Sequence, residues 1–328
     1  MMKLMRFVLA LCVVFLLNAT AFAADAIRIG AVVSATGIAS FIGDPEVKAL
    51  QTYAQKVNPL GGVLGQKLEV VPYGDAGEAV KHRTLTSRLV DQNGVVAAIG
   101  GSTTVRTLAM VPFIEAADVL GMLMREQYLK TVGSCGATVV AEQSYGVSDV
   151  DMTPQRLRVR GTPGVQAIRN TSGVGDTVIT RNRAQLGIEK SLFYMTHASA
   201  SKSYIQVAGM VAEGVQPPVS VLLVGSKLPA GDPQRPVVLG YVGKIAKTAK
   251  QPVNAFSGSA YDALMMTAWA TERVGGTDSA RIRDALEQTK GFVGTAGVVT
   301  MSERDHLGFA EEAFRVVEVR SGDWTLVD

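Results

Sequence analysis

The most suggestive chemistry in the sequence lies in a short loop rich in glycine and hydroxyl side chains. Gly100-Gly101-Ser102-Thr103-Thr104 follows an apolar run and precedes a helical pattern. Free backbone amides at a helix N-terminus, together with three hydroxyl groups, suit a carboxylate or another small anion. Serine and threonine are equally favoured as ordinary helix caps, so the loop alone leaves both interpretations open. A phosphate-binding P-loop is excluded because no Gly-Lys-Ser/Thr triplet ends the loop.

A second loop of this kind occupies residues 34–41, with the sequence Ser-Ala-Thr-Gly-Ile-Ala-Ser-Phe. It also follows a strand-like run. The Phe41 ring has two interpretations: it covers a bound ligand, or it packs on the helix that follows.

The three histidines do not form a catalytic group. His82 lies in a helical pattern between two basic residues and predicts a solvated face, and His306 lies in a turn. Only His197 follows a predicted strand, at the position where a binding loop belongs.

Enzyme and metal motifs are missing as well. The hydrolase pattern Gly-x-Ser-x-Gly does not occur. Cys12 lies in the N-terminal apolar run and Cys135 stands alone, so neither an internal disulfide nor a structural zinc site is expected. We therefore expect no enzymatic activity, no metal and no cofactor.

Strand and helix patterns alternate along the N-terminal half. Expected strands are 27–33, 67–73 and 95–99, and expected helices are 44–57, with Asp44 as cap and Pro45 first, 78–92, and one reaching about residue 117. Such an order implies a parallel sheet with right-handed crossovers. In open α/β sheets ligands lie at the carboxyl ends of strands, which is where both loops fall.

The C-terminal half repeats the alternation more loosely, so the simplest architecture has two α/β lobes. The expected strands are 137–141, 164–169, 191–196, 219–224, 297–301 and 313–319, and the expected helices are 174–186, 233–250, 259–274 and 278–289.

Residues 1–23 predict a cleaved secretory signal. Lys3 and Arg6 precede an apolar run of about 11 residues, and Ala21-Phe22-Ala23 provides a small-x-small cleavage site. A membrane-spanning helix needs roughly 20 apolar residues. Removing 23 residues from a chain of 328 leaves 305 and lowers the net charge from +3 to +1. We expect an exported, periplasmic protein with cleavage near Ala23.

Composition sets the broad class. The 47% of hydrophobic residues exclude disorder, and the small net charge argues against nucleic-acid binding.

Taken together, these stretches resemble the periplasmic solute-binding proteins of the branched-chain amino acid (leucine/isoleucine/valine-binding) type that serve ABC transporters. The resemblance extends over nearly all of the mature chain. The residues that carry it are 29–31, 36–44, 61–69 (Gly-Gly-Val-Leu-Gly-Gln-Lys-Leu-Glu), 73–75, 88–90, 99–104, 184–187, 260–264 and 291–295.

The resemblance implies an α/β fold with two Rossmann-like lobes and a hinge, the type I periplasmic binding protein architecture. Residues 24–119 would form lobe one and 120–290 lobe two, with 291–328 returning as strands to the hinge and lobe one. Such proteins capture a small carboxylated ligand between the lobes, as monomers, and deliver it to the membrane subunits of an ABC permease.

It also implies ligand-binding residues. Ser102, Thr103 and Thr104 would hold the ligand carboxylate, and Phe41 would pack over its body. From lobe two, Ser172, His197 and Phe256 fall near positions that contact the amine or side chain. Amino-acid-binding members often carry an acid where His197 stands, which leaves other aliphatic or aromatic acids open.

The largest departure lies at residues 119–125. Residues 119–124 pass straight into Arg125, which begins a run similar to the first helix of lobe two. The chain is roughly fifty residues shorter here than the resemblance requires. We therefore expect lobe two to be incomplete at its start, without one central strand, one hinge strand and about half of the ligand anchors. A sheet that loses a central strand must re-pair or expose an edge.

Three functions remain open. The first is an ABC-importer receptor for a small carboxylated ligand, branched-chain or related. The second is a degraded paralogue without binding, and the third is a sensor or interaction module that reuses the fold.

Overall fold

The computed structural model describes residues 26–37, 39–103, 106–107, 109–110, 136–146, 149–171, 175–187, 192–250 and 252–327. Several sequence-based expectations lie outside these residues: the signal segment 1–23, the discontinuity at 119–125, Cys135, Thr104 and Ser172.

The first lobe is built on a three-stranded parallel sheet. Strand β1 (Ile27–Val33) lies in the centre between β2 (Leu68–Gly74) and β3 (Ala97–Gly100), in the order β2-β1-β3. Almost every residue of β1 is buried, as expected for a parallel strand covered on both faces. The three strands and the parallel pairing predicted from the sequence are confirmed.

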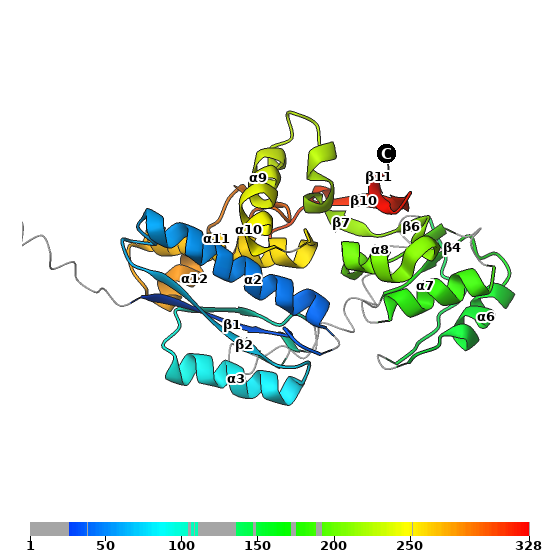
Figure 1. Ribbon diagram of the computed structural model, residues 1–328, viewed down its shortest axis with the longest axis horizontal. Helices are drawn as coiled ribbons and strands as arrows, with labels where there is room; N and C mark the ends of the chain where they lie inside the picture. The colour runs from blue at the N-terminus through cyan, green and yellow to red at the C-terminus, as the bar shows by residue number, and fades with distance from the viewer. Residues whose placement is uncertain are drawn as a thin grey trace, which may run out of the picture.

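Helix α2 (Ser40–Val57) covers one face of this sheet, and α3 (Ala79–Gln92) lies on the opposite side (Figure 1). The sequence predicted a start at Asp44, but α2 begins four residues earlier and Pro45 lies inside it. The side chain of Asp44 pairs with Lys48 at 2.7 Å rather than capping the helix. A Cβ atom at Gly43 would come within 2.4 Å of the Ser34 backbone, so this glycine lets α2 approach the end of β1 closely.

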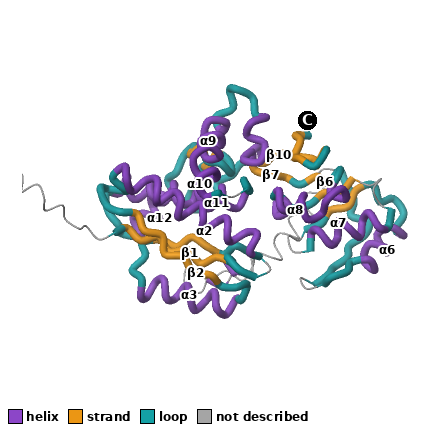
Figure 2. The backbone as a smooth tube through the Cα atoms, viewed as in Figure 1, coloured by secondary structure: helices purple, strands orange, loops and turns teal. Residues whose placement is uncertain are grey.

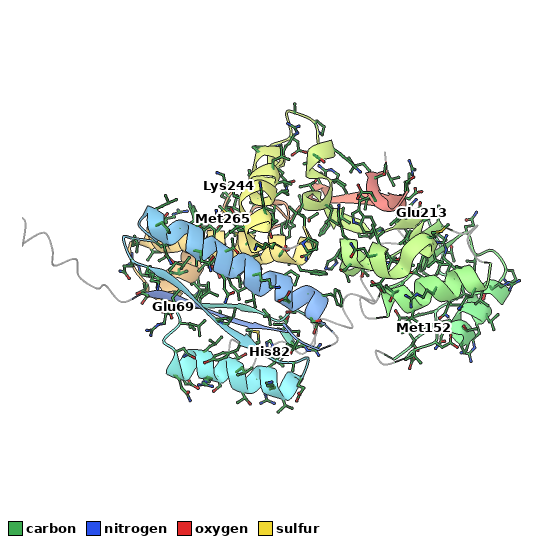
Figure 3. The ribbon with its side chains drawn as sticks, viewed as in Figure 1. Glu69, His82, Met152, Glu213, Lys244 and Met265 are labelled. Carbon is green, nitrogen blue, oxygen red and sulfur yellow. The ribbon has the colours of Figure 1, made fainter. Side chains whose placement is uncertain are left out.

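Helix α3 corrects one expectation. The sequence predicted a solvated face around His82, but its side chain is fully buried, on a helix that packs against the strands (Figure 3). Thr86 and Leu89 share the buried face. The prediction was wrong because the helix turns the two neighbouring basic residues toward solvent and His82 toward the sheet.

Two helices from late in the chain also pack on the first lobe. In α11 (Ala255–Val274), Ala260, Leu264 and Ala268 join the core formed by β1 and α2, and α12 (Ser279–Glu287) packs on α11 (Figure 1). The sequence analysis assigned these helices to lobe two. Their packing follows from the apolar spacing of four residues along α11, which matches the buried face of α2.

The second lobe has a smaller parallel sheet. Its strands β4 (Ala167–Arg169), β5 (Leu192–Tyr194) and β6 (Val215–Gln216) lie in the order β4-β5-β6. Helices α6 (Thr153–Gly161), α7 (Asp176–Gln185) and α8 (Lys202–Ala208) accompany them.

The predicted strand at 137–141 is not formed: these residues carry no strand, and Val139 and Val140 are 42% and 49% exposed. A β-strand needs a neighbour to pair with its backbone. Among the described residues β4 pairs only with β5, so no strand pairs with residues 137–141 there. The predicted loss of a central strand stays a prediction.

Antiparallel strands connect the lobes near the C-terminus. The sheet β11-β10-β7 joins β7 (Pro218–Ser220), β10 (Phe314–Arg320) and β11 (Asp323–Leu326) (Figure 2). Trp324 is fully buried in the second-lobe core, with its ring stacked 6.5 Å from that of Tyr204.

The remaining elements lie between β7 and β10, apart from short 3-10 turns. They are the 3-10 segment η4 (Val221–Lys227), α9 (Gln234–Tyr241), the π-helical turn η5 (Val242–Ala246), α10 (Lys247–Ala249), and the hairpin of β8 (Phe292–Val293) and β9 (Val298–Val299). Within the described residues, no helix is both long and apolar enough to span a membrane.

Candidate functional site

Three of the predicted ligand-binding residues come together where the lobes meet. Phe41 lies in the first turn of α2, Phe256 in the first turn of α11, and His197 begins the 3-10 turn η2 (His197–Ser199) after β5. The Phe41 and Phe256 rings meet edge to face at 6.3 Å, and the His197 ring lies 6.4 Å from Phe256. Edge-to-face pairs at this spacing are favourable. Burial lowers the pKa of His197 below its usual value, which favours the neutral imidazole.

A cavity of about 410 Å³ adjoins this aromatic cluster. Its walls come from the start of α2, the start of α8 and the segment before α11. The lining residues are Ala35, Ser40, Phe41, Asp44, Pro45, Ser201, Lys202, Ser203, Pro252 and Asn254. Because one wall carries Asp44 and the opposite wall Lys202, the cavity offers charges of both signs. Its volume suits a small organic molecule.

Ser102 lies in the predicted loop after β3, but its hydroxyl group already has partners. It accepts a hydrogen bond from the Ser34 backbone N–H at 3.0 Å and donates one to Glu46 Oε2 at 2.6 Å. Burial raises the pKa of Glu46 to about 7, with the Ser102 hydrogen bond acting in the opposite direction. No motif in the sequence marks Glu46, because it lies inside α2 and its partner Ser102 is 56 residues away along the chain.

Thr103 is held differently. Arg106 Nη1 donates to Thr103 Oγ1 at 2.8 Å, and Arg106 Nη2 donates to the Gly77 carbonyl. Because Thr103 accepts this bond, its own hydroxyl hydrogen is not used by it. Within the described residues the Thr103 hydroxyl donates no hydrogen bond, so its hydrogen is available.

A buried Asp-His pair lies beneath these loops. Asp75, just after β2, accepts hydrogen bonds from the Gly77 N–H at 2.7 Å, Ser34 Oγ at 3.2 Å and His82 Nδ1 at 2.7 Å. Burial acts to raise the pKa of Asp75, but these hydrogen bonds outweigh it and hold the pKa below its usual value. One carboxylate thus fixes the ends of β1 and β2 relative to α3, and with them the binding loops.

The second lobe carries its own buried carboxyl group. Asp176, at the start of α7, accepts hydrogen bonds from Asn170 and Ser199, and Tyr145 donates to Asn170. Burial raises the pKa of Asp176 to about 7 despite these bonds. The group ties the end of β4 to the η2 turn that carries His197.

Metal binding finds no support in the described part of the chain, where no three His, Cys, Asp or Glu residues gather at a distance suited to one ion.

The family follows from a comparison of the whole chain. A family model described as periplasmic binding protein matches residues 26–123 and 113–323. This chain belongs to the periplasmic binding protein family. Its members are extracytoplasmic solute-binding receptors. The family resemblance and the fold class predicted from the sequence are therefore confirmed. The two matched stretches of this periplasmic binding protein overlap at residues 113–123, a range that shares residues 119–123 with the predicted discontinuity at 119–125. No curated protein sequence matches it.

Solved structures agree on the fold. An extracellular ligand-binding receptor from Rhodopseudomonas palustris is 19% identical with a TM-score of 0.81, and the match covers 92% of this chain and 99% of that one. A leucine-binding protein from Thermotoga maritima is 18% identical with a TM-score of 0.72, covering 92% and 98%. A branched-chain amino acid transporter substrate-binding protein from Streptococcus pneumoniae, solved with isoleucine, is 17% identical with a TM-score of 0.75, also covering 92% and 98%.

Proposed function

We propose that this periplasmic binding protein is the receptor of an ABC importer, and that it captures a small carboxylated ligand between its lobes. The observation that supports this proposal is a ring cluster beside the cavity. Phe41, Phe256 and His197 come from three separate elements and lie together there, and residues of both lobes line the cavity. A ligand seated there would contact both lobes at once. Such contact is what makes domain closure depend on the ligand.

The hydroxyl groups of the first-lobe loop after β3 suit a carboxylate. Thr103 keeps a hydroxyl donor, and a carboxylate accepts hydrogen bonds only. On the second lobe, His197 replaces the acid expected for an α-amino ligand, and its lowered pKa favours a neutral ring. Branched-chain amino acids and related aliphatic or aromatic acids therefore form the candidate class, with Ser102, Thr104 and Ser172 as further contacts.

The cellular setting completes the proposal. The chain would be exported by its N-terminal segment, cleaved near Ala23, and act as a monomer in the periplasm. Its partners would be the permease membrane subunits, with neither cofactor, nucleic acid nor enzymatic turnover involved.

Isothermal titration of the mature protein against leucine, isoleucine, valine, phenylalanine, benzoate and short aliphatic acids tests the proposal. Saturable binding to any of them, accompanied by a rise in melting temperature, is expected. The matched variant Phe41→Ala should bind the same compound at least tenfold more weakly. If no compound gives a binding signal although the protein unfolds cooperatively, the proposed receptor function is wrong.

Two observations favour a second candidate, a paralogue that no longer binds. In the second lobe, the three guanidinium nitrogens of the buried Arg156 lack hydrogen bonds, and residues 137–141 expose apolar side chains. Both features weaken the lobe that must close on a ligand. Flat titrations together with aggregation would support this candidate.

A further inference from the structure

The strongest unexplained feature lies behind the predicted anchor loop. The Ser102 hydroxyl is held between two groups of its own lobe, the Ser34 N–H at 3.0 Å and Glu46 Oε2 at 2.6 Å. A hydroxyl group has one hydrogen to donate. While that hydrogen points to the Glu46 carboxylate, Ser102 can offer none to a ligand carboxylate.

We propose that Glu46 is a positioning residue for Ser102, and that it couples the binding of a carboxylated ligand at this loop to the uptake of one proton. The inference rests on the proposed function for its ligand, but the Glu46–Ser102 pair exists without one.

The protonation state of Glu46 decides which group donates the hydrogen bond between Glu46 and Ser102. With Glu46 ionised, Ser102 donates to it. When Glu46 takes a proton from solvent, its O–H donates to Ser102 Oγ, which still accepts the Ser34 N–H with its other lone pair. The Ser102 hydrogen can then rotate toward the ligand. One proton enters for each carboxylate bound, so the site gains no net charge and no bond other than hydrogen bonds changes.

The charges around Glu46 agree with this role. Asp75, from the loop after β2, adds a negative charge that raises the Glu46 pKa. Arg106 Nε lies 3.9 Å from Asp75 Oδ2 and His82 bonds the same oxygen, so both face Asp75. On α2 itself, Asp44 and Lys48 pair with each other. Among the described residues no cation forms an ion pair with Glu46, and its pKa of about 7 allows protonation near neutral pH.

A measurement without ligand tests the pair itself. The ¹³C carboxyl resonance of Glu46, assigned with Glu46→Gln, should titrate with a midpoint near pH 7 in the mature protein. Ser102→Ala should raise this midpoint, because it removes the hydrogen bond that lowers the Glu46 pKa. An ordinary midpoint near 4.5, or one that Ser102→Ala leaves unchanged, would overturn the inference whatever the protein binds.

A second measurement tests the coupling. With the tightest probe among leucine, phenylalanine and benzoate, wild-type affinity should fall about tenfold from pH 6 to pH 8. Titrations in buffers of different ionisation enthalpy should show proton uptake that rises toward one per ligand at pH 8. Glu46→Gln, whose amide donates to Ser102 at every pH, should keep the pH 6 affinity within twofold at pH 8. The exposed-site control Glu303→Gln should behave as wild type.

The outcomes separate the two proposals. A pH-dependent affinity that Glu46→Gln leaves intact would overturn the inference and assign the proton to another group. If the Glu46 midpoint lies near 7 and responds to Ser102→Ala while no probe binds at any pH, the proposed function fails and the coupling to a ligand fails with it.

Discussion

Two buried arginines lie against one phenylalanine ring in the second-lobe core. The guanidinium of Arg156 lies 4.8 Å from the Phe193 ring centre and that of Arg183 at 5.2 Å. Burial lowers the pKa of Arg156 to about 10, and the charge of Arg183 adds to the effect. The cation–π contact offsets part of the desolvation cost of Arg156, but its buried charge remains costly because its guanidinium nitrogens make no hydrogen bonds within the described part of the chain.

Replacing Arg156 should therefore stabilise the protein. Arg156→Met keeps the apolar stem and removes a guanidinium without hydrogen bonds, so we expect the free energy of unfolding to rise by about 1 kcal/mol, after the loss of the cation–π contact is subtracted. Urea unfolding at pH 7 measures it. Arg160→Met, at an exposed site of the same helix, should change stability little. A loss of stability in Arg156→Met would show that the charge has a partner in solution.

The buried Asp176 should make stability depend on pH. Its folded pKa is raised from 3.8 to about 7, so the protonated form favours the folded state. That contribution is complete below about pH 4 and is lost as pH rises through 7. Between pH 5 and pH 8 it should cost roughly 2–3 kcal/mol. Asp176→Asn should flatten this part of the pH profile of urea unfolding, whereas the exposed control Glu303→Gln should not. Equal slopes in Asp176→Asn and wild type would contradict the assignment.

For single residues, the sequence predicted which side chains lie together better than it predicted which side chains are buried. Phe41, His197 and Phe256 were found by resemblance, and they do lie together. His82, Glu46 and Asp176 were missed because their roles depend on what the fold brings against them. A histidine flanked by Lys81 and Arg83 looks solvated in sequence, and only the orientation of α3 shows otherwise.

The elements differ in how far local pattern determines them. β1 and α3 lie within one or two residues of their predicted bounds, since their apolar periodicity is continuous. The strand predicted at 137–141 is rich in β-branched residues but forms no ladder, because strand formation depends on a neighbouring strand. Likewise, the apolar face of α11 was visible in sequence while its partner in the first lobe was not. Chain order alone does not say which lobe a late helix joins.

Segment 137–141 should contribute little to folding. Val140→Ser should change the free energy of unfolding by less than about 0.5 kcal/mol, because the side chain is half exposed and the segment carries no strand. Val215→Ser, on the fully buried β6, should cost roughly 2 kcal/mol or more. In hydrogen exchange, amides of 137–141 should exchange far faster than those of β5. Protection equal to that of β5 would mean that a partner strand covers this segment.

The whole molecule joins the lobes through chain segments far apart in sequence. The chain leaves the second lobe through β7, places α11 and α12 on the first lobe, and returns along β10 and β11 to bury Trp324 in the second-lobe core. Each lobe therefore depends on residues from both halves of the chain. Movement of one lobe against the other bends these connections without breaking either core, which is the arrangement that hinge closure needs.

Closure should depend on the aromatic cluster where the lobes meet, in which His197 of the second lobe lies 6.4 Å from Phe256, and Phe41 packs on Phe256 from the first lobe. In small-angle scattering, the radius of gyration of the mature wild-type protein should fall when a bound probe from the titration panel is added, because the ligand favours the closed state. Phe41→Ala should weaken binding at least tenfold, about 1.4 kcal/mol, and require correspondingly more probe for the same compaction. Phe309→Ala, which removes a partly exposed ring paired with Phe314 outside the cavity, serves as the aromatic control. If saturating probe leaves the radius of gyration unchanged, binding does not close these lobes.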